Sequence, residues 1–369
     1  MSRRRLRPTS RGSRETGFVQ PPFAAVKNPM APLEPISSDQ VEVIHHASLN
    51  ILRDVGIKVD SKIARKLLHE AGADIDHDTA RVRFDPGIVE DMLIGIPSEF
   101  TIHARNPDKT LTVGKNAMIF ATVCGPSFVS DIDQGRRQGT REDMRNFVKL
   151  ASMLNIFHHE GGSGCEPMDL PPETRHLDMM LAQTTLTDKG WQPCWLNSAE
   201  RARDCIEMAK IALQTDDAGL REKPGIIGGI NTNSPLLLDD SQAEGLIEFA
   251  RAGQPIHVTP FTLAGAMSPV TIGGSLVQQN AEALAGIVLG QAAARGAPVF
   301  YGHFTSNVDM RTGSPAFGTP EYAKSVLVSA QMARRYGLPI RSSNTTASAV
   351  VDAQAAYEAA NTLQTSALA

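Results

Sequence analysis

The fold is decided by residues 225–261, in which two short apolar runs flank one amphipathic segment. The sequence GIIGGIN (225–231) precedes DSQAEGLIEFARAG (240–253), which in turn precedes IHVTPF (256–261). The middle segment begins with acidic and hydroxyl residues, repeats apolar residues at helical spacing and ends in glycine, all of which are typical of a helix. Two short apolar runs separated by a helix predict a βαβ unit, and therefore a parallel sheet.

The same alternation continues in both directions along the chain. Further apolar runs occur at residues 117–123, 156–160, 192–197, 299–303 and 339–344, and amphipathic helices separate them. Seven repeated βα units predict an α/β fold, and we expect a TIM (β/α)-barrel over residues 116–369. Because such a barrel has eight units, we expect it to be C-terminally incomplete in this chain. An open doubly wound sheet also accepts seven strands, but the steady alternation favours the barrel.

The residues before these repeats have a different composition. Residues 1–33 are rich in arginine, proline, glycine and serine, and they predict a disordered basic tail. Residues 34–115 hold two helical segments, one opening near Ser38 and one following Ser61, and then alternating segments typical of hairpins. We therefore expect an N-terminal α+β cap ahead of the barrel domain.

The composition argues against several classes of protein. The net charge of -4 and the pI near 6.2 give no reason to expect nucleic-acid binding. No apolar run reaches the roughly 20 residues that a membrane span needs, and the first residues lack the apolar centre of a secretory signal. The four cysteines include no C-x-x-C pair, which favours reduced thiols and a cytoplasmic protein.

Candidate site residues are found at the carboxyl ends of the predicted strands, where a (β/α)-barrel carries its functional side chains. The second strand ends in Glu160, and a Gly-rich loop leads from it to Glu166. A carboxylate beside a flexible loop at a strand end is a candidate ligand-binding group. Later strand ends carry asparagine, threonine and serine beside aromatic residues. They indicate a pocket of neutral polar groups and aromatic faces, although such residues also simply begin loops.

A metal site is not expected from the sequence. Histidines such as His257 and His303 lie near strands, but the first strand has no histidine pair of the kind that a metal-dependent hydrolase barrel carries there. A lone histidine on a strand is more often a hydrogen-bonded core residue than a ligand. We therefore assign no metal ligand.

Particular runs give the sequence a resemblance to a known family. Residues 231–236 (NTNSPL), residues 352–358 (DAQAAYE) and the Gly-Gly-Ser-Gly loop at 161–164 resemble the trimethylamine methyltransferase (MttB) family. The resemblance covers residues 38–369. Members of that family look like TIM barrels. The resemblance implies that they move a methyl group from an amine to the Co(I) centre of a separate corrinoid protein. The resemblance thus implies a methyltransferase with a corrinoid protein as partner and no cofactor bound tightly by this chain.

The resemblance also bears on the substrate. Trimethylamine enzymes of the family carry pyrrolysine, and none occurs in this sequence. The chain thus looks like a non-pyrrolysine member, acting on a methylated amine, either trimethylamine or a quaternary amine such as glycine betaine. Chemistry favours the quaternary amine, because it leaves as a neutral amine without prior activation. We assign no catalytic acid or base for that reason.

The resemblance gives the candidate residues binding roles. Either carboxylate would face the cation, aromatic side chains would form a cage for it, and the amide and imidazole groups would hold a substrate carboxylate or orient the reaction. These substrate-binding candidates are Glu160, Glu166, Trp195, Asn231, Asn233, Phe261, Tyr301, His303, Phe304 and Asn344.

Two other functions stay open on the sequence. One is a non-catalytic or truncated barrel that binds betaine-like ligands without transferring a methyl group. The other is an S-adenosylmethionine methyltransferase, which is disfavoured because no Gly-rich nucleotide loop follows the first strand. We also expect the chain to form a homo-oligomer.

Overall fold

The structure is a computed structural model that describes residues 19–193 and 196–369. Its helices are α1 (Ser38–Asn50), α2 (Lys62–Glu70), α3 (Pro86–Leu93), α4 (Arg141–Met153), α5 (Arg175–Leu186), α6 (Ala199–Leu213), α7 (Asp217–Glu222), α8 (Asp240–Arg251), α9 (Ile272–Ala293), α10 (Pro320–Arg335) and α11 (Ala353–Leu368). Its strands are β1 (Val26–Lys27), β2 (Ile57–Val59), β3 (Asp74–Asp76), β4 (Arg81–Arg83), β5 (Glu99–Ile102), β6 (Leu111–Gly114), β7 (Ala117–Met118), β8 (Phe128–Asp131), β9 (Gly135–Gln138), β10 (His159–Glu160), β11 (Gly190–Trp191), β12 (Gly228–Ile230), β13 (Leu237–Leu238), β14 (Ile256–Val258), β15 (Leu263–Ala264), β16 (Val299–Gly302), β17 (Ser306–Asn307) and β18 (Ile340–Arg341).

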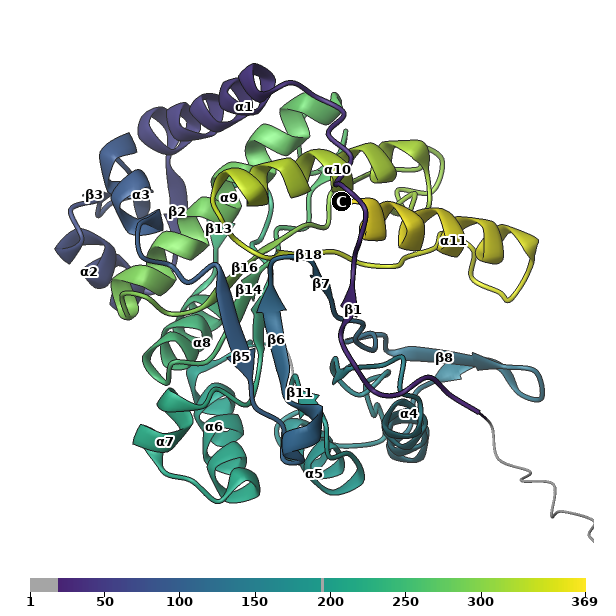
Figure 1. Cartoon of the computed structure of the whole chain (residues 1–369). Helices are drawn as coiled ribbons and strands as arrows, with labels where there is room; N and C mark the ends of the chain where they lie inside the picture. The colour runs from purple at the N-terminus through teal and green to yellow at the C-terminus, as the bar shows by residue number, and fades with distance from the viewer. Residues whose placement is uncertain (1–18, 194–195) are drawn as a thin grey trace, which may run out of the picture.

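Parallel strands in chain order form the centre of the molecule (Figure 1). β12, β14, β16 and β18 pair in that order, and every pairing is parallel. β10 pairs with β11, also in parallel, and single parallel bridges join Trp191 to Ile226 and Ala121 to His159. Seven chain segments therefore lie side by side in sequence order, without the reversal of order that a doubly wound sheet has. Within residues 19–193 and 196–369, no strand pairing joins β18 to the segment at Ala121.

The chain is thus a mixed α/β protein, as the alternation of the sequence predicts. The observed strands are shorter than the predicted runs, and the first run differs most. Its start, β7, pairs antiparallel with β1, and only Ala121 bridges to the parallel strands. Ala121 and Val123 are exposed, so this run lacks the burial on both faces that central parallel strands have.

Helices cover one face of the parallel strands, which we call the outer face. α8, α9 and α10 pack against β12, β14, β16 and β18. Ile230, Val258 and Tyr301 belong to the large core cluster on this side. Successive residues of a strand point to opposite faces, so the neighbours of these three side chains face away from the helices. We call that side the inner face.

A hairpin closes the inner face at the amino ends of the strands. β5 and β6 pair antiparallel, and Phe100, Ile102 and Val113 form a separate apolar cluster with Ile227. The ring of Phe100 meets the ring of Phe300 edge-on, with centroids 5.1 Å apart. Figure 1 shows this hairpin in front of β14 and β16. The amino ends are therefore packed with apolar side chains, and polar inner-face groups lie nearer the carboxyl ends.

The N-terminal helices pack against the same core. α1, α2 and α3 all contact α9, and one continuous apolar cluster runs from Val41 to Leu338. β2 also pairs with β13, which follows β12 in the chain. The boundary near residue 115 between a cap and a barrel domain stays a prediction, since the two regions share this core.

Residues 19–33 were expected to belong to a disordered tail, and the structure places them against the body. β1 pairs with β7, and the Phe23 ring contacts the His158 ring at a centroid distance of 5.7 Å. The carbonyl oxygen of Ala24 lies 2.8 Å from His158 Nε2. The remainder of the predicted tail, residues 1–18, lies outside the described residues.

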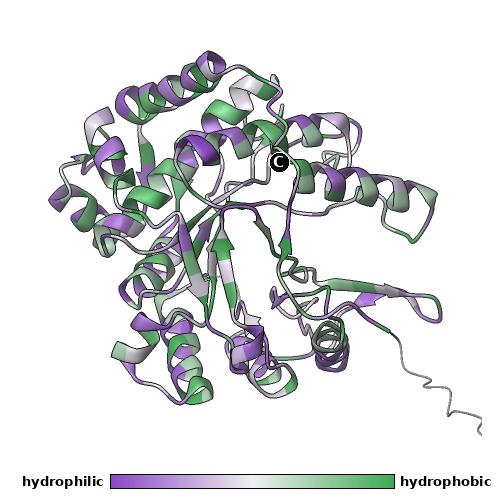
Figure 2. Cartoon of the chain, viewed as in Figure 1, coloured by the Kyte–Doolittle hydropathy of each residue, from purple (hydrophilic) through white to green (hydrophobic). Residues whose placement is uncertain are grey.

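The helices begin and end at the capping residues that their sequence predicts. Ser37 caps α1 and exchanges hydrogen bonds with Gln40, and Gly337 ends α10 with a φ of 67°. Figure 2 shows hydrophobic and hydrophilic residues alternating around the helices, as in helices that bury one face. Of the helices in the described ranges, none is long and apolar enough to cross a membrane.

Candidate active site

Glycines open the middle of the inner face. Gly229 lies beside His257, and a Cβ atom at Gly229 would come within 2.2 Å of the His257 ring. A Cβ at Gly302 would come within 2.1 Å of Thr259 Oγ1. Contacts this short do not occur between side-chain atoms, so any larger residue would displace the polar groups. The absence of side chains at these two positions is what lets His257 and Thr259 occupy the inner face.

A short polar chain crosses this face. His257 Nδ1 lies 2.9 Å from Thr259 Oγ1, and His257 Nε2 lies 3.3 Å from Gln192 Oε1. Burial lowers the pKa of His257 well below its usual value and lowers the pKa of His159 to about 3. His159 Nε2 is buried and makes no hydrogen bond to any described residue. Both imidazoles are therefore neutral at physiological pH, and one has an unused polar atom.

Three phenylalanines gather at the carboxyl ends of β14 and β16, and we call them the phenyl cluster. The centroid of the Phe304 ring lies 5.2 Å from that of Phe261 and 5.1 Å from that of Phe317. All three side chains are partly exposed. Aromatic faces attract cations through the ring quadrupole, so a partly open group of rings suits a quaternary ammonium ion.

An arginine lies beside the phenyl cluster. Arg341 ends β18, and its carbonyl oxygen accepts a hydrogen bond of 2.9 Å from the N–H of His303. Its guanidinium carbon lies 5.8 Å from the centroid of the Phe304 ring. Burial lowers the pKa of Arg341, but arginine is basic enough to remain charged. This region therefore contains a permanent cation, which the sequence analysis did not single out.

Two of the predicted site residues lie on the outer face instead. The hydroxyl of Tyr301 donates to Asn280 Oδ1 at 2.9 Å, within α9. His303 Nε2 lies 3.0 Å from Ser325 Oγ of α10. Both residues are fully buried against these helices. Strand alternation explains the outcome: Phe304 faces inward, so Tyr301 and His303 cannot line the same surface.

Glu160 holds the Gly-rich loop that follows β10. Its carboxyl oxygens accept hydrogen bonds from the side chains of Thr122, at 2.9 Å, and Gln183, at 2.5 Å. The backbone N–H groups of Gly162 and Ser163 also donate to it, at 3.2 and 2.6 Å. Burial raises the pKa of this carboxyl, which these donors oppose. Its oxygens are thus used within the chain rather than directed at the phenyl cluster.

Glu166 is likewise paired within the chain. Its Oε2 lies 3.8 Å from Arg175 Nη1 of α5, and both side chains are mostly buried. Burial raises the pKa of Glu166, and the nearby arginine acts in the opposite direction. The structure therefore does not bring Glu160 and Glu166 together at one cation site. Trp195, the remaining aromatic candidate of the sequence analysis, lies outside the described residues.

The three predicted asparagines occupy different surroundings. The side-chain amide of Asn231 lies 3.1 Å from the carbonyl oxygen of Thr259, on the inner side of β14. Asn233 closes the following loop through two backbone hydrogen bonds to β13. Asn344 is exposed, and its Oδ1 accepts a hydrogen bond of 3.0 Å from Thr362 of α11. Asn231 is thus the asparagine that the fold places with the inner-face polar groups.

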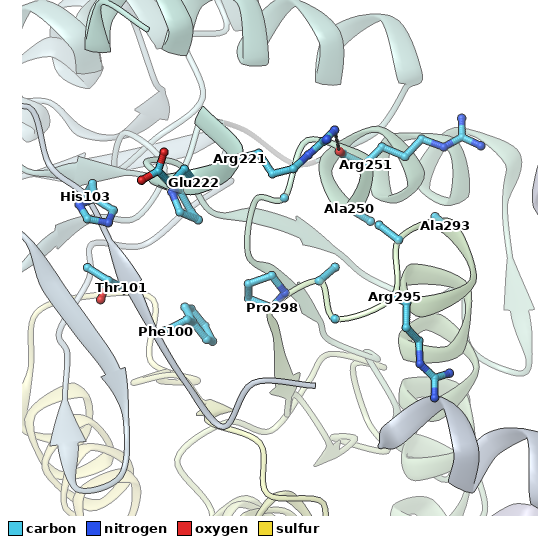
Figure 3. A pocket seen from close by; sticks show the side chains of 15 residues that line it. Phe100, Thr101, His103, Arg221, Glu222, Ala250, Arg251, Ala293, Arg295 and Pro298 are labelled. Carbon is cyan, nitrogen blue, oxygen red and sulfur yellow. Dashed lines mark hydrogen bonds between the residues drawn. The ribbon is translucent and has the colours of Figure 1, made fainter. Parts of the chain in front are cut away.

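A separate cavity of about 860 Å³ lies at the other end of the strands (Figure 3). Pro224 and Pro298, which precede β12 and β16, form part of its wall together with Phe100 of β5. Arg221 of α7 also borders it and donates a hydrogen bond of 2.7 Å to the carbonyl oxygen of Arg251. This cavity contains no residue of the phenyl cluster and none of the predicted substrate-binding residues.

Outside residues 1–18 and 194–195, no three histidine, cysteine, aspartate or glutamate side chains lie together as a metal site would require.

Comparison with known proteins relates the whole chain to one group. The family described as trimethylamine methyltransferase (MTTB) matches residues 2–369. A glycine betaine methyltransferase of Desulfitobacterium hafniense (strain Y51) is 38% identical over 332 residues, which are 89% of this chain and 68% of the relative. Trimethylamine methyltransferase MttB of D. hafniense (strain DSM 10664 / DCB-2) is 29% identical over 324 residues, which are 87% of this chain and 65% of that protein.

Among solved structures, the monomethylamine methyltransferase (MtmB) of Methanosarcina barkeri aligns with a TM-score of 0.48 and 12% identity. The alignment covers 91% of this chain and 76% of that chain. The curated relatives are therefore matched over about two thirds of their own length.

Proposed function

Because the chain belongs to the trimethylamine methyltransferase family, we propose that it transfers a methyl group from a methylated amine to the Co(I) centre of a separate corrinoid protein. The substrate we propose is a quaternary amine of the glycine betaine type. The corrinoid is the methyl acceptor, brought by its own protein, and this chain binds and orients the amine.

The observation that carries this proposal is the phenyl cluster at the carboxyl ends of β14 and β16. A quaternary ammonium ion has no N–H to donate in a hydrogen bond, so it is recognised by aromatic faces and by shape. Phe261, Phe304 and Phe317 present such faces in partly exposed positions. Each good contact of this kind contributes about 0.5–2 kcal/mol.

The neutral imidazoles support the same chemistry. A methyl carbon attacked by a strong nucleophile leaves a neutral amine behind, so the step needs no proton transfer. His159 and His257 are uncharged because burial lowers the pKa of each, and they repel no cation. The contribution of the protein is therefore to align the methyl group with the acceptor, which acts by proximity.

We also propose that the scaffold is a (β/α)-barrel with its mouth at the carboxyl ends of the strands. Seven parallel segments in sequence order, with the helices on one face, support that arrangement. The cytoplasmic location and the homo-oligomer are proposals as well.

Spectroscopy with a panel of substrates tests the function. The protein is mixed with a corrinoid protein reduced to Co(I) and with trimethylamine, choline or glycine betaine in turn. We expect methyl-corrinoid absorbance with a quaternary amine and none without the protein. Binding of betaine with no methyl transfer would instead favour the non-catalytic barrel. Calorimetric binding of S-adenosylmethionine would revive the third function.

A further inference from the structure

Arg341 lies on the inner face of the parallel strands. β18 pairs in parallel with β16, with Arg341 opposite Gly302, so the backbone of Arg341 is fixed in the sheet. Ile340, its neighbour, packs against the large core cluster on the outer face. Strand alternation therefore directs Arg341 inward, on the same face as Thr259 and His257.

The guanidinium of Arg341 has no partner of opposite charge. Across residues 19–193 and 196–369, no carboxylate forms a salt bridge with it and no acceptor forms a hydrogen bond with it. Its contact is with the ring of Phe304. By contrast, Arg137 on the surface pairs with both Asp131 and Asp143. The Arg341 side chain is partly exposed, and a partly buried cation without a carboxylate partner is available to bind an anion.

Four groups of the chain are close enough to Arg341 to interact with it electrostatically, namely His257, His303, Tyr322 and the thiol of Cys124, and none of them is a carboxylate. Burial lowers the pKa of both histidines and raises the pKa of the tyrosine, so all three are neutral at physiological pH. The cationic site therefore calls for an anion from outside the described chain.

A carboxylate is the anion that fits these surroundings. A guanidinium binds a carboxylate through two parallel hydrogen bonds, which ammonium groups cannot do. The phenyl cluster lies directly beside it, with the Phe304 ring 5.8 Å from the guanidinium carbon. One short molecule can therefore reach both groups only if it carries a carboxylate a few bonds from a quaternary nitrogen.

We propose that Arg341 binds the carboxylate of a zwitterionic substrate whose quaternary ammonium group lies against Phe261, Phe304 and Phe317. The inference rests on the proposed function, because it names the class of amine that this site accepts. Trimethylammonium compounds without a carboxylate are selected against, since they would place a second cation beside Arg341 with nothing to balance either charge.

Calorimetric binding with three matched probes tests the assignment in the absence of any corrinoid. Glycine betaine carries both charges, choline carries the cation alone, and 3,3-dimethylbutanoate carries the carboxylate on an uncharged group of the same shape. We expect glycine betaine to bind the unmodified protein at least about 10-fold more tightly than either other probe, because it alone engages both groups.

Variants then separate recognition from folding. Arg341→Met is expected to weaken glycine betaine binding by about 10- to 150-fold, to leave choline binding unchanged or stronger, and to leave the melting temperature unchanged or higher. Arg341→Lys keeps the charge but loses the paired geometry, so an intermediate loss is expected. Arg311→Met removes an exposed arginine from the loop after β17 and serves as the matched control, with binding unchanged within about twofold.

Defined outcomes would overturn the inference. They are equal affinity for choline and glycine betaine, no measurable betaine binding, or an Arg341→Met variant that loses choline and betaine together. The methyl-transfer assay decides the proposed function separately. Arg341-dependent betaine binding without methyl transfer would reject that function and leave the carboxylate site standing. Efficient methyl transfer from choline that does not depend on Arg341 would support the proposed function and reject the carboxylate site.

Discussion

Glu282 and Arg341, two charged groups on opposite faces of the parallel sheet, differ in how fully their hydrogen bonds are used. On the outer face, the carboxyl group of Glu282 in α9 has four donors. The hydroxyls of Thr232 and Ser234 donate to one oxygen, each at 2.6 Å. The N–H of Leu236 and the amide of Gln278 donate to the other, each at 2.9 Å. Both oxygens of this carboxyl group are therefore fully used within the chain, and neither is available to a ligand.

On the inner face, two polar groups have unused hydrogen-bonding capacity. The guanidinium of Arg341 has no hydrogen-bonding partner in the described part of the chain, and neither has Nε2 of His159. Groups that only support the fold are normally satisfied within the chain. The contrast between Glu282 and Arg341 therefore separates a charge that stabilises the protein from one left available to bind something else; on the outer face, Nδ1 of His303 also has no partner among the described residues.

Glu282→Leu should have the largest effect on the fold. The substitution leaves two hydroxyls and one backbone N–H without an acceptor and removes one of the two acceptors of the Gln278 amide. We expect the free energy of unfolding to fall by about 3–5 kcal/mol. Urea denaturation followed by circular dichroism measures the change. The matched control is Glu222→Leu on the exposed α7, expected to stay within about 0.5 kcal/mol. Equal effects of the two variants would break the comparison.

Acid should destabilise the protein through histidines on both faces. Burial lowers the pKa of His159 and His303 to about 3 and that of His257 well below its usual value. The unfolded chain then binds protons that the folded chain does not. The contribution of these neutral histidines to the free energy of unfolding is complete above about pH 6.5. It is lost as the pH falls, by about 1.4 kcal/mol per pH unit for each group.

Urea denaturation between pH 7.5 and 5 tests this slope. Burial raises the pKa of Glu160 and Glu166, which acts in the opposite direction by adding stability as the pH falls. His303→Gln should remove one histidine contribution and make the slope shallower. A free energy of unfolding that does not change with pH would contradict the assignment of neutral buried imidazoles.

Phe304→Leu should have a smaller effect, confined to the inner face. The leucine keeps apolar volume but has no aromatic face, so glycine betaine binding should weaken by about 2- to 30-fold, with little change in the free energy of unfolding. Calorimetry measures the affinity. Phe128→Leu, in the exposed hairpin formed by β8 and β9, is the matched control. Unchanged affinity in Phe304→Leu would remove the phenyl cluster from the site.

Periodicity predicted the order of the elements but not which way each side chain points. The runs at 225–231, 256–261 and 299–303 all contain parallel strands of the central sheet. Parallel strands are apolar on both faces, so their sequence does not reveal which residues face the helices. That ambiguity is why Tyr301, on the outer face, was predicted alongside Phe304, on the inner one.

Two further differences have similar causes. The predicted site residues are mainly polar and aromatic residues at strand ends, and Arg341, which lies inside the predicted strand at 339–344, is not among them. The spacing of Met144, Phe147 and Leu150 predicts one buried face for α4, yet Phe147 and Leu150 are exposed and Val148 is buried beside Met144. Helical spacing allows either stripe, and contact with the rest of the fold decides between them.

The glycines on the inner face limit how this protein could be engineered. Enzyme redesign usually enlarges a pocket by trimming side chains, but Gly229 and Gly302 have none to trim. Adding even one methyl group there would collide with His257 or Thr259. Altered specificity would have to come from Arg341 and the phenylalanines, where chemical character rather than volume is the variable.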